Sequence, residues 1–301
     1  MKWNTSRQCV SAVVVLTAAL QCCIVAAADS RTVSTRKPAD LDGTVEIDNV
    51  AGRVEVTGWD RAEVEVTGTI GDRVERVDVI TSVGHTTVRV VLPQESGATG
   101  DSLAAELVVH IPRKSLLKAA LVSASITTRD LQGEQQLRTV SGNIDGVLAQ
   151  EAKINTVSGS VKLAASAGPL DVSSIAGTIS VNGATGEIRV GTVSARADLV
   201  LGSLSRAHFQ TVSGSMSVSG SLAPGAQLEA LSVSGPLRFT LNGAADYDID
   251  SFSGSIDNCY GPKAERSGYG PGLHLTFRDG DGNARVRMGT QSGPIHLCNH
   301  S

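Results

Sequence analysis

The chain has 301 residues, of which 41% are hydrophobic and 3% aromatic, and its net charge is −4. This length is ample for a core, but the scarcity of aromatic rings means that Val, Ile and Leu must fill the core in narrow layers. Such a composition suits a thin body of stacked strands better than a broad globular core. The pI of about 5.9 argues against a protein that binds nucleic acid.

Residues 1–28 are typical of a secretion signal. Lys2 and Arg7 give a positive start, residues 10–25 are mostly apolar, and Ala28 ends a run of small residues that suits cleavage. We therefore expect an exported protein, in the periplasm or at the cell surface, with no membrane span once the signal is removed.

Two alternatives for this segment stay open. One is an uncleaved membrane anchor, although the apolar run is short for a span. The other is a lipoprotein modified at Cys22, although Gln21 is a poor residue before a lipidated cysteine. Cleavage after Ala28 would remove two basic residues and no acidic ones, which leaves 24 basic and 30 acidic residues and a net charge of −6.

Two cysteines, Cys259 and Cys298, would remain in the mature chain. In an exported protein we expect them to pair. The bond would close a loop of 39 residues and restrict the unfolded chain by about 3–4 kcal/mol. Two free buried thiols are the alternative.

The chain begins with a polar segment, residues 29–40, that we predict to be a mobile lead-in. Residues 41–112 then alternate apolar and polar side chains, which indicates strands with one buried and one wet face. We interpret them as a charged N-terminal β cap, interrupted by a Ser- and Gly-rich loop at 93–101. The expected strands lie around Val45 and Ile47, Val54 and Val56, Val64 and Val66, and over 74–80, 86–92 and 104–111.

The main feature of residues 113–256 is a repeated motif, clearest in Thr156-Val157-Ser158-Gly159-Ser160-Val161. Its third position recurs in steps of 18, 17, 18, 18, 19, 21 and 19 residues, and a last copy follows 39 residues later. A fixed period of this kind predicts a solenoid. The third positions are residues 123, 141, 158, 176, 194, 213, 234, 253 and 292.

Stacking of these coils at about 4.8 Å would align Val, Ile and Leu in interior columns. The glycine of each motif would turn a corner and let the next coil approach, while the preceding serine bonds to neighbouring backbone. Ser194-Ala195-Arg196 lacks the glycine, so we expect that corner to be built differently. The predicted corner glycines are Gly142, Gly159, Gly177, Gly214, Gly235, Gly254 and Gly293.

Residues 257–301 depart from the period and are predicted to form a C-terminal cap. Residues 273–277 and 284–288 would pair as a hairpin across Asp279-Gly280-Asp281-Gly282, and the disulfide would fasten this hairpin to the last coil. The expected fold is all-β: a β-solenoid-like or β-helix-like stack of about 18-residue coils between a charged N-terminal β cap and a C-terminal hairpin cap. Handedness, the number of strands per coil and the oligomeric state stay open.

The chain resembles the bacterial DUF4097 proteins, a family of adhesin-like proteins. The resemblance rests on Val50, Gly52, Val54 and Val56, on Val108-Val109-His110-Ile111-Pro112, on the repeated Val-Ser-Gly-Ser-Val units and on Gly293-Pro294-Ile295-His296-Leu297. It implies a β-solenoid-like body, suggests adhesion, and supplies no catalytic or cofactor-binding residues.

Acidic clusters give weak signals for a metal. Asp279-Gly280-Asp281-Gly282-Asn283 resembles the start of a calcium loop, but Ala284 and Thr290 stand where that loop needs Gly and Glu. We interpret this segment as a turn. Asp246, Asp248 and Asp250 would line one face of a strand, which we interpret as solvated.

We find no Gly-x-Ser-x-Gly motif with plausible catalytic partners. We interpret Arg189, Arg196 and Arg206 as a solvated face of neighbouring coils. The six histidines are scattered and lack the spacing of a metal site: His85, His110, His208, His274, His296 and His300.

Three functions follow from these patterns. The first is a non-enzymatic envelope protein whose rigid β surface binds a partner protein or glycan. The second is a carbohydrate-active enzyme, which usually needs clustered acids and aromatic sugar platforms, and Trp59 is the one tryptophan outside the signal. The third is a periplasmic scaffold or sensor. We expect no cofactor, no metal and no nucleic-acid partner.

Overall fold

The computed structural model describes residues 31–93, 100–165, 168–259, 261–266, 268, 271–281 and 283–298. Within these ranges nearly all regular structure is β-strand, and the helical element is one 3-10 turn, η1 (Gly100–Leu103). The described part of the chain contains no helix whose length and apolar character would suit a membrane span. The predicted secretion signal over residues 1–28, its cleavage site at Ala28, and His300 lie outside the described residues.

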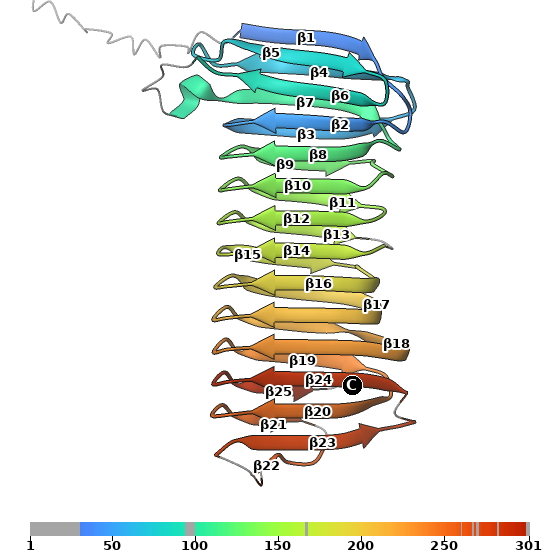
Figure 1. Cartoon of the computed structure of the whole chain (residues 1–301), viewed down its shortest axis with the longest axis vertical. Helices are drawn as coiled ribbons and strands as arrows, with labels where there is room; N and C mark the ends of the chain where they lie inside the picture. The colour runs from blue at the N-terminus through green and yellow to red at the C-terminus, as the bar shows by residue number, and fades with distance from the viewer. Residues whose placement is uncertain are drawn as a thin grey trace, which may run out of the picture.

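The body is a flattened stack of coils in which each coil adds one strand to each of two parallel sheets (Figure 1). The prediction of a β-solenoid-like stack is therefore confirmed, with two strands per coil. In stacking order, the middle of the first sheet is β2 (Thr44–Asn49), β8 (Leu116–Leu121), β10 (Gln135–Thr139), β12 (Ala152–Thr156), β14 (Leu170–Ser174) and β16 (Gly186–Thr192). The middle of the second sheet is β3 (Gly52–Trp59), β9 (Ser125–Arg129), β11 (Ile144–Leu148), β13 (Val161–Ala165) and β15 (Thr178–Asn182).

The next two coils are made by unusually long strands, β17 (Arg196–Thr211) and β18 (Met216–Ser232). Each runs in the second sheet over its first part and in the first sheet over its last part. The pairing of β17 with β18 shifts register between Val200 and Ser203 and between Leu204 and Arg206. The longer motif steps of 19 and 21 residues are absorbed at these shifts, so the stack continues without a break.

The core lies between the two sheets and is made of columns of apolar side chains. In the first sheet, Leu137, Ile154, Val172, Val190 and Phe209 stand in register on successive strands, and each is almost fully buried. Alternation along each strand places these side chains inward and their neighbours in water. The interior columns expected from the repeat are present.

At the N-terminal end the spatial order of the strands departs from chain order. The coil of β2 and β3 lies between β8 and β9 on one side and two later strands on the other (Figure 1). These later strands are β6 (His85–Val91) and β7 (Ala105–Pro112), and antiparallel strands β5 (Arg76–Ser82), β4 (Glu63–Ile70) and β1 (Arg31–Pro38) close the two sheets.

The prediction of a mobile lead-in over residues 29–40 is wrong for residues 31–38. These residues form β1, which pairs with β4 along its whole length from Arg31 with Ile70 to Pro38 with Glu63. Without β1, the backbone groups along the outer edge of β4 would be unpaired, and such an edge promotes aggregation. The charged side chains of β1 then form a protected outer edge.

The C-terminal end has a matching interruption. β24 (Ala284–Thr290) and β25 (Ile295–Cys298) come last in the chain but stack directly on β18 and β19 (Leu237–Asn242). The earlier strands β20 (Ala245–Ser251) and β21 (Ile256–Asn258) lie beyond them (Figure 1). β23 (Leu273–Asp279) closes the first sheet antiparallel to β20, and β22 (Glu265–Arg266) pairs with β23.

The predicted C-terminal hairpin is therefore wrong, although both of its strands exist. β23 and β24 lie on opposite edges of β20 and do not pair with each other. As an inserted coil, β24 pairs with β18 on one edge and β20 on the other and buries Val286 and Met288. A hairpin would have given it one partner strand instead of two, so insertion satisfies more backbone groups.

Candidate functional site

The motif corners lie above one another along one long side of the stack (Figure 1, left). The N–H of Ser158 donates to the carbonyl of Val140 at 2.9 Å, and the N–H of Ala176 donates to the carbonyl of Val157 at 2.7 Å. The Ser158 hydroxyl donates to the same Val140 carbonyl at 3.3 Å. The third motif residue of each coil thus donates its N–H to the carbonyl of the second motif residue in the coil stacked before it.

The seven predicted corner glycines stand in this column because the coils approach too closely for a side chain. A Cβ at Gly159 would lie 1.9 Å from the carbonyl oxygen of Gly142, and a Cβ at Gly254 would lie 2.1 Å from that of Gly293. Glycine is therefore needed at each of these positions for close contact between coils, in addition to its role in the turn.

The corner without glycine keeps the serine hydrogen bonds of its neighbours but is built differently in other respects, as expected. The Arg196 N–H donates to the Gly177 carbonyl at 3.1 Å, and the Thr192 hydroxyl donates to the Thr211 hydroxyl at 2.9 Å. Ser194 donates its N–H to the Ile175 carbonyl at 2.8 Å and its hydroxyl at 3.1 Å. Ala195 is fully buried, and the glycine of the preceding coil, Gly177, has a φ of 107°. That left-handed φ, which glycine adopts freely, sets the corner beneath Ala195.

A buried row of hydroxyls supports the corners from inside. The first motif residue is Thr or Ser and is 1% to 8% exposed from Thr139 to Thr290. The Thr156 hydroxyl accepts the N–H of Gly159 at 3.1 Å, and the Thr211 hydroxyl donates to the Gly214 carbonyl at 3.1 Å. These bonds satisfy backbone groups of the corner that water cannot reach.

The second motif residue points the opposite way and forms an exposed apolar row. These side chains are between 41% and 61% exposed, and each belongs to a coil that stacks on the next. Gln291 interrupts the row on the inserted coil, between Val233 and Phe252. We call this row the corner ridge: Val122, Val140, Val157, Ile175, Val193, Val212, Val233 and Phe252.

The sequence interpretation missed the ridge because it treated the apolar residues of the repeat as core. Ile154 points inward, so Asn155 points outward, Thr156 inward and Val157 outward. Counting the period of two through the motif would have placed its polar Thr inside and its apolar Val outside.

A second surface feature is a shallow depression on the outer face of the first sheet, across β16, β17, β18 and β24. Four arginines face it, with two glutamates between them: Arg189, Arg206, Arg285 and Arg287 with Glu187 and Glu229. We call this feature the arginine depression.

Acidic neighbours partly neutralise the four arginines of the arginine depression. Glu187 bridges two arginines, Arg189 on its own strand and Arg206 on the next at 3.3 Å. Glu229 lies 3.2 Å from the ring of His208. Arg287 pairs with Asp248 at 3.6 Å, and Arg285 stands in register with Asp246 on β20 and helps to lower the pKa of its carboxyl.

The structure brings together two of the three arginines that the sequence singled out. Arg189 and Arg206 lie in the arginine depression, whereas Arg196 lies on the exposed face of the second sheet, paired in register with Thr178. The first part of β17 belongs to the second sheet and its last part to the first sheet. Arg196 and Arg206 therefore face opposite sides of the body.

The three aspartates of β20 face water, as expected, but all are ion-paired. Asp246 accepts two hydrogen bonds from Arg278, at 2.5 and 3.0 Å, and these hold the pKa of its carboxyl below the usual range. Asp250 lies 2.7 Å from the ring of His274. Asp248 lies 3.6 Å from Arg287.

Asp248, Asp250 and His274 offer ligand atoms within 4.8 Å of one another. They are exposed side chains at the end of the stack, and ion pairing accounts for their positions. They do not by themselves indicate a metal site.

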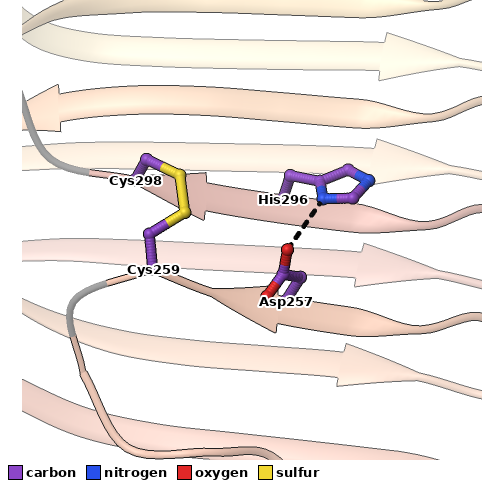
Figure 2. The surroundings of a disulfide bond; sticks show 4 residues. All are labelled: Asp257, Cys259, His296 and Cys298. Carbon is purple, nitrogen blue, oxygen red and sulfur yellow. Dashed lines mark hydrogen bonds and ion pairs between the residues drawn. A yellow bond between two sulfur atoms is a disulfide. The ribbon is translucent and has the colours of Figure 1, made fainter.

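The two cysteines are joined as a disulfide between neighbouring strands at the C-terminal end. Cys259 follows β21 and Cys298 ends β25, with their Cα atoms 4.9 Å apart (Figure 2). His296 and Asp257, each two residues before a cysteine, pair across the same two strands at 3.3 Å (Figure 2). The bond therefore ties the inserted coil to the coil beyond it, and not a hairpin to the stack.

Comparisons with known proteins give weak similarities. No family model matches the sequence, so the resemblance to DUF4097 proteins stays a prediction, and no curated protein matches either. Among solved structures, a "putative cell adhesion protein" from Clostridium sporogenes matches at 8% identity and a TM-score of 0.26, covering 90% of this chain and 100% of that one. A "putative lipid binding protein" from Parabacteroides distasonis matches at 13% identity and a TM-score of 0.40, covering 88% of this chain and 96% of that one. The chain is thus similar to these two proteins at a level too low to carry an argument about function.

Proposed function

We propose that this chain is a non-enzymatic protein of the cell envelope that binds an elongated partner protein along the corner ridge. The observation that carries the proposal is the repetition of one exposed apolar side chain on successive stacked coils. Scattered exposed hydrophobic residues are normal on soluble proteins, but a continuous row is typical of an interaction surface.

The shape of the ridge supports an elongated partner. One side chain per coil at about 4.8 Å spacing gives a long, narrow contact that a compact partner would cover only in part. The neighbouring serine hydroxyls, such as those of Ser158 and Ser213, already donate to backbone carbonyls. Apolar contact and matching spacing would therefore provide most of the affinity.

The charge of the chain disfavours a second copy as the occupant. The full sequence has 30 acidic and 26 basic residues, and cleavage of the expected signal would increase the excess of acid. Two copies aligned along their length would repel each other at low salt. A partner with a less acidic surface suits the ridge better.

The disulfide supports a location outside the cytoplasm, since such bonds persist in oxidising compartments.

The ion pairs support a non-enzymatic role. Hydrogen bonds from Arg36 and Arg278 lower the pKa of the Glu65 and Asp246 carboxyls, which keeps both groups charged. The ring of Trp59 stacks on His110 and lies under Arg61, so it is no open sugar platform.

The ridge is tested with the variant Val140→Thr, Val157→Thr, Ile175→Thr, Val193→Thr. Threonine is also β-branched, so the backbone preference is retained while the apolar surface is lost. We expect binding of the mature protein to intact cells of the producing organism to weaken at least tenfold, as measured by surface plasmon resonance or a cell-retention assay.

The matched control is Val147→Thr with Val200→Thr, two valines of the second sheet that are at least as exposed as the replaced ridge residues but lie off the ridge. This variant should bind as the unchanged protein does. Equal binding by the ridge variant and the unchanged protein would contradict the proposal. Sedimentation that shows a dimer lost only in the ridge variant would instead identify a second copy as the occupant.

A further inference from the structure

We propose that the arginine depression binds a linear acidic polysaccharide through its carboxylate groups. The depression lies on the outer face of the first sheet, whereas the ridge lies at the corner between the sheets. The proposal therefore goes beyond the partner suggested for the ridge, and either can fail without the other.

The cations are arranged along the stack. Arg206, Gln227 and Arg285 stand opposite one another in register on three successive strands, β17, β18 and β24. Strand spacing places the backbones of Arg206 and Arg285 about 10 Å apart. On β16, Glu187 stands in register with Arg206, and Arg189 begins a second row that continues through His208 and Glu229 to Arg287. A linear ligand that crosses the strands along either row would meet two guanidinium groups.

The charge balance favours an anionic ligand. Four arginines and two glutamates line the depression, Asp246 and Asp248 lie beside Arg285 and Arg287 at its edge, and the chain as a whole is acidic. A cationic patch on an acidic body attracts anions locally and repels them elsewhere, which guides a ligand to the patch. Guanidinium groups also bind carboxylates through paired hydrogen bonds.

The glutamates between the arginines favour a glycan over a dense polyphosphate or nucleic acid. Glu187 and Glu229 would repel closely spaced phosphates. The same carboxylates accept hydrogen bonds from sugar hydroxyls, and the Gln227 amide both donates and accepts. An alternation of carboxylate and hydroxyl groups on the ligand therefore matches the alternation of arginine with glutamate and glutamine in the depression.

The experiment is a calorimetric titration of the mature protein with oligogalacturonate of about ten sugars, at low and at raised salt. We expect binding that weakens as salt rises, because exposed charges are screened. The same oligomers with their carboxylates methyl-esterified keep the sugar backbone and lose the charge, so they should bind at least tenfold more weakly. Inorganic polyphosphate and single-stranded DNA of similar length are the competing polyanions.

The test variant is Arg206→Gln with Arg285→Gln, which should reduce affinity for the acid oligomer at least tenfold. Arg196→Gln with Arg238→Gln is the matched control, since both arginines are exposed on the second sheet. An unchanged melting temperature shows that each variant is folded. Equal binding of the methyl esters, binding of polyphosphate or DNA as strong as that of the acid oligomer, or an equal loss in the control variant would each overturn the proposal.

Discussion

At the scale of single residues, the corner of each coil depends on a glycine whose missing side chain leaves room for the neighbouring coil. Gly159 shows this most clearly, because its Cβ position lies 1.9 Å from the Gly142 carbonyl oxygen and its φ is not left-handed. Close contact between coils, and not only the turn, is therefore the main reason for glycine there. The motif allowed these positions to be predicted, but the contact involves a residue of another coil and cannot be read from local sequence.

We predict that Gly159→Ala destabilises the protein by about 1–3 kcal/mol, the usual effect of forcing an extra methyl group into packed structure. Gly191→Ala is the control, because a Cβ there would meet its nearest atom, the Ser173 hydroxyl oxygen, at 3.9 Å. Urea unfolding followed by circular dichroism measures both. A Gly159→Ala protein as stable as the Gly191→Ala protein would show that the coils are farther apart than described.

The elements at both ends of the stack break chain order. The coil of β2 and β3 lies inside β6 and β7, and the coil of β24 and β25 lies inside β20 and β21. The sequence predicted most of these strands, since alternation along a strand is a local pattern. It did not predict their partners: the turn at Gly280 between two alternating runs is typical of a hairpin, yet parallel insertion provides partners on both edges of β24.

The disulfide at this end should hold the inserted coil in place. By closing a loop of 39 residues, it lowers the entropy of the unfolded chain and raises the free energy of unfolding by about 4 kcal/mol. We predict that Cys259→Ser with Cys298→Ser lowers the free energy of unfolding by about that amount. Hydrogen exchange by mass spectrometry should show β21, β24 and β25 losing protection first, while β10 to β15 stay protected.

The matched comparison is the unchanged protein with its disulfide reduced, which should behave like the double-serine variant. Loss of protection spread evenly over all coils, or none at all, would mean that the bond does not act on the inserted coil.

At the scale of the whole molecule, the repeat period was enough to predict a stacked β body, because each step of about 18 residues marks one coil. The candidate surfaces were harder to predict. The ridge was hidden because Val was assumed to be buried, and the arginine depression combines residues up to 100 positions apart, from Glu187 to Arg287. Stacking places them together, and no local pattern indicates which coils become neighbours at an interrupted end.

Every motif places its second residue in one exposed column, including the motif on the out-of-order coil at the C-terminal end. Distances between nitroxide labels on added cysteines, measured by double electron–electron resonance with the native disulfide intact, test this arrangement. From position 157, position 291 is five coils away and position 252 is six. We predict separations of about 24 Å for Val157→Cys with Gln291→Cys and about 29 Å for Val157→Cys with Phe252→Cys. A shorter distance to position 252 than to position 291 would mean that the coils follow chain order and that β24 and β25 are not inserted.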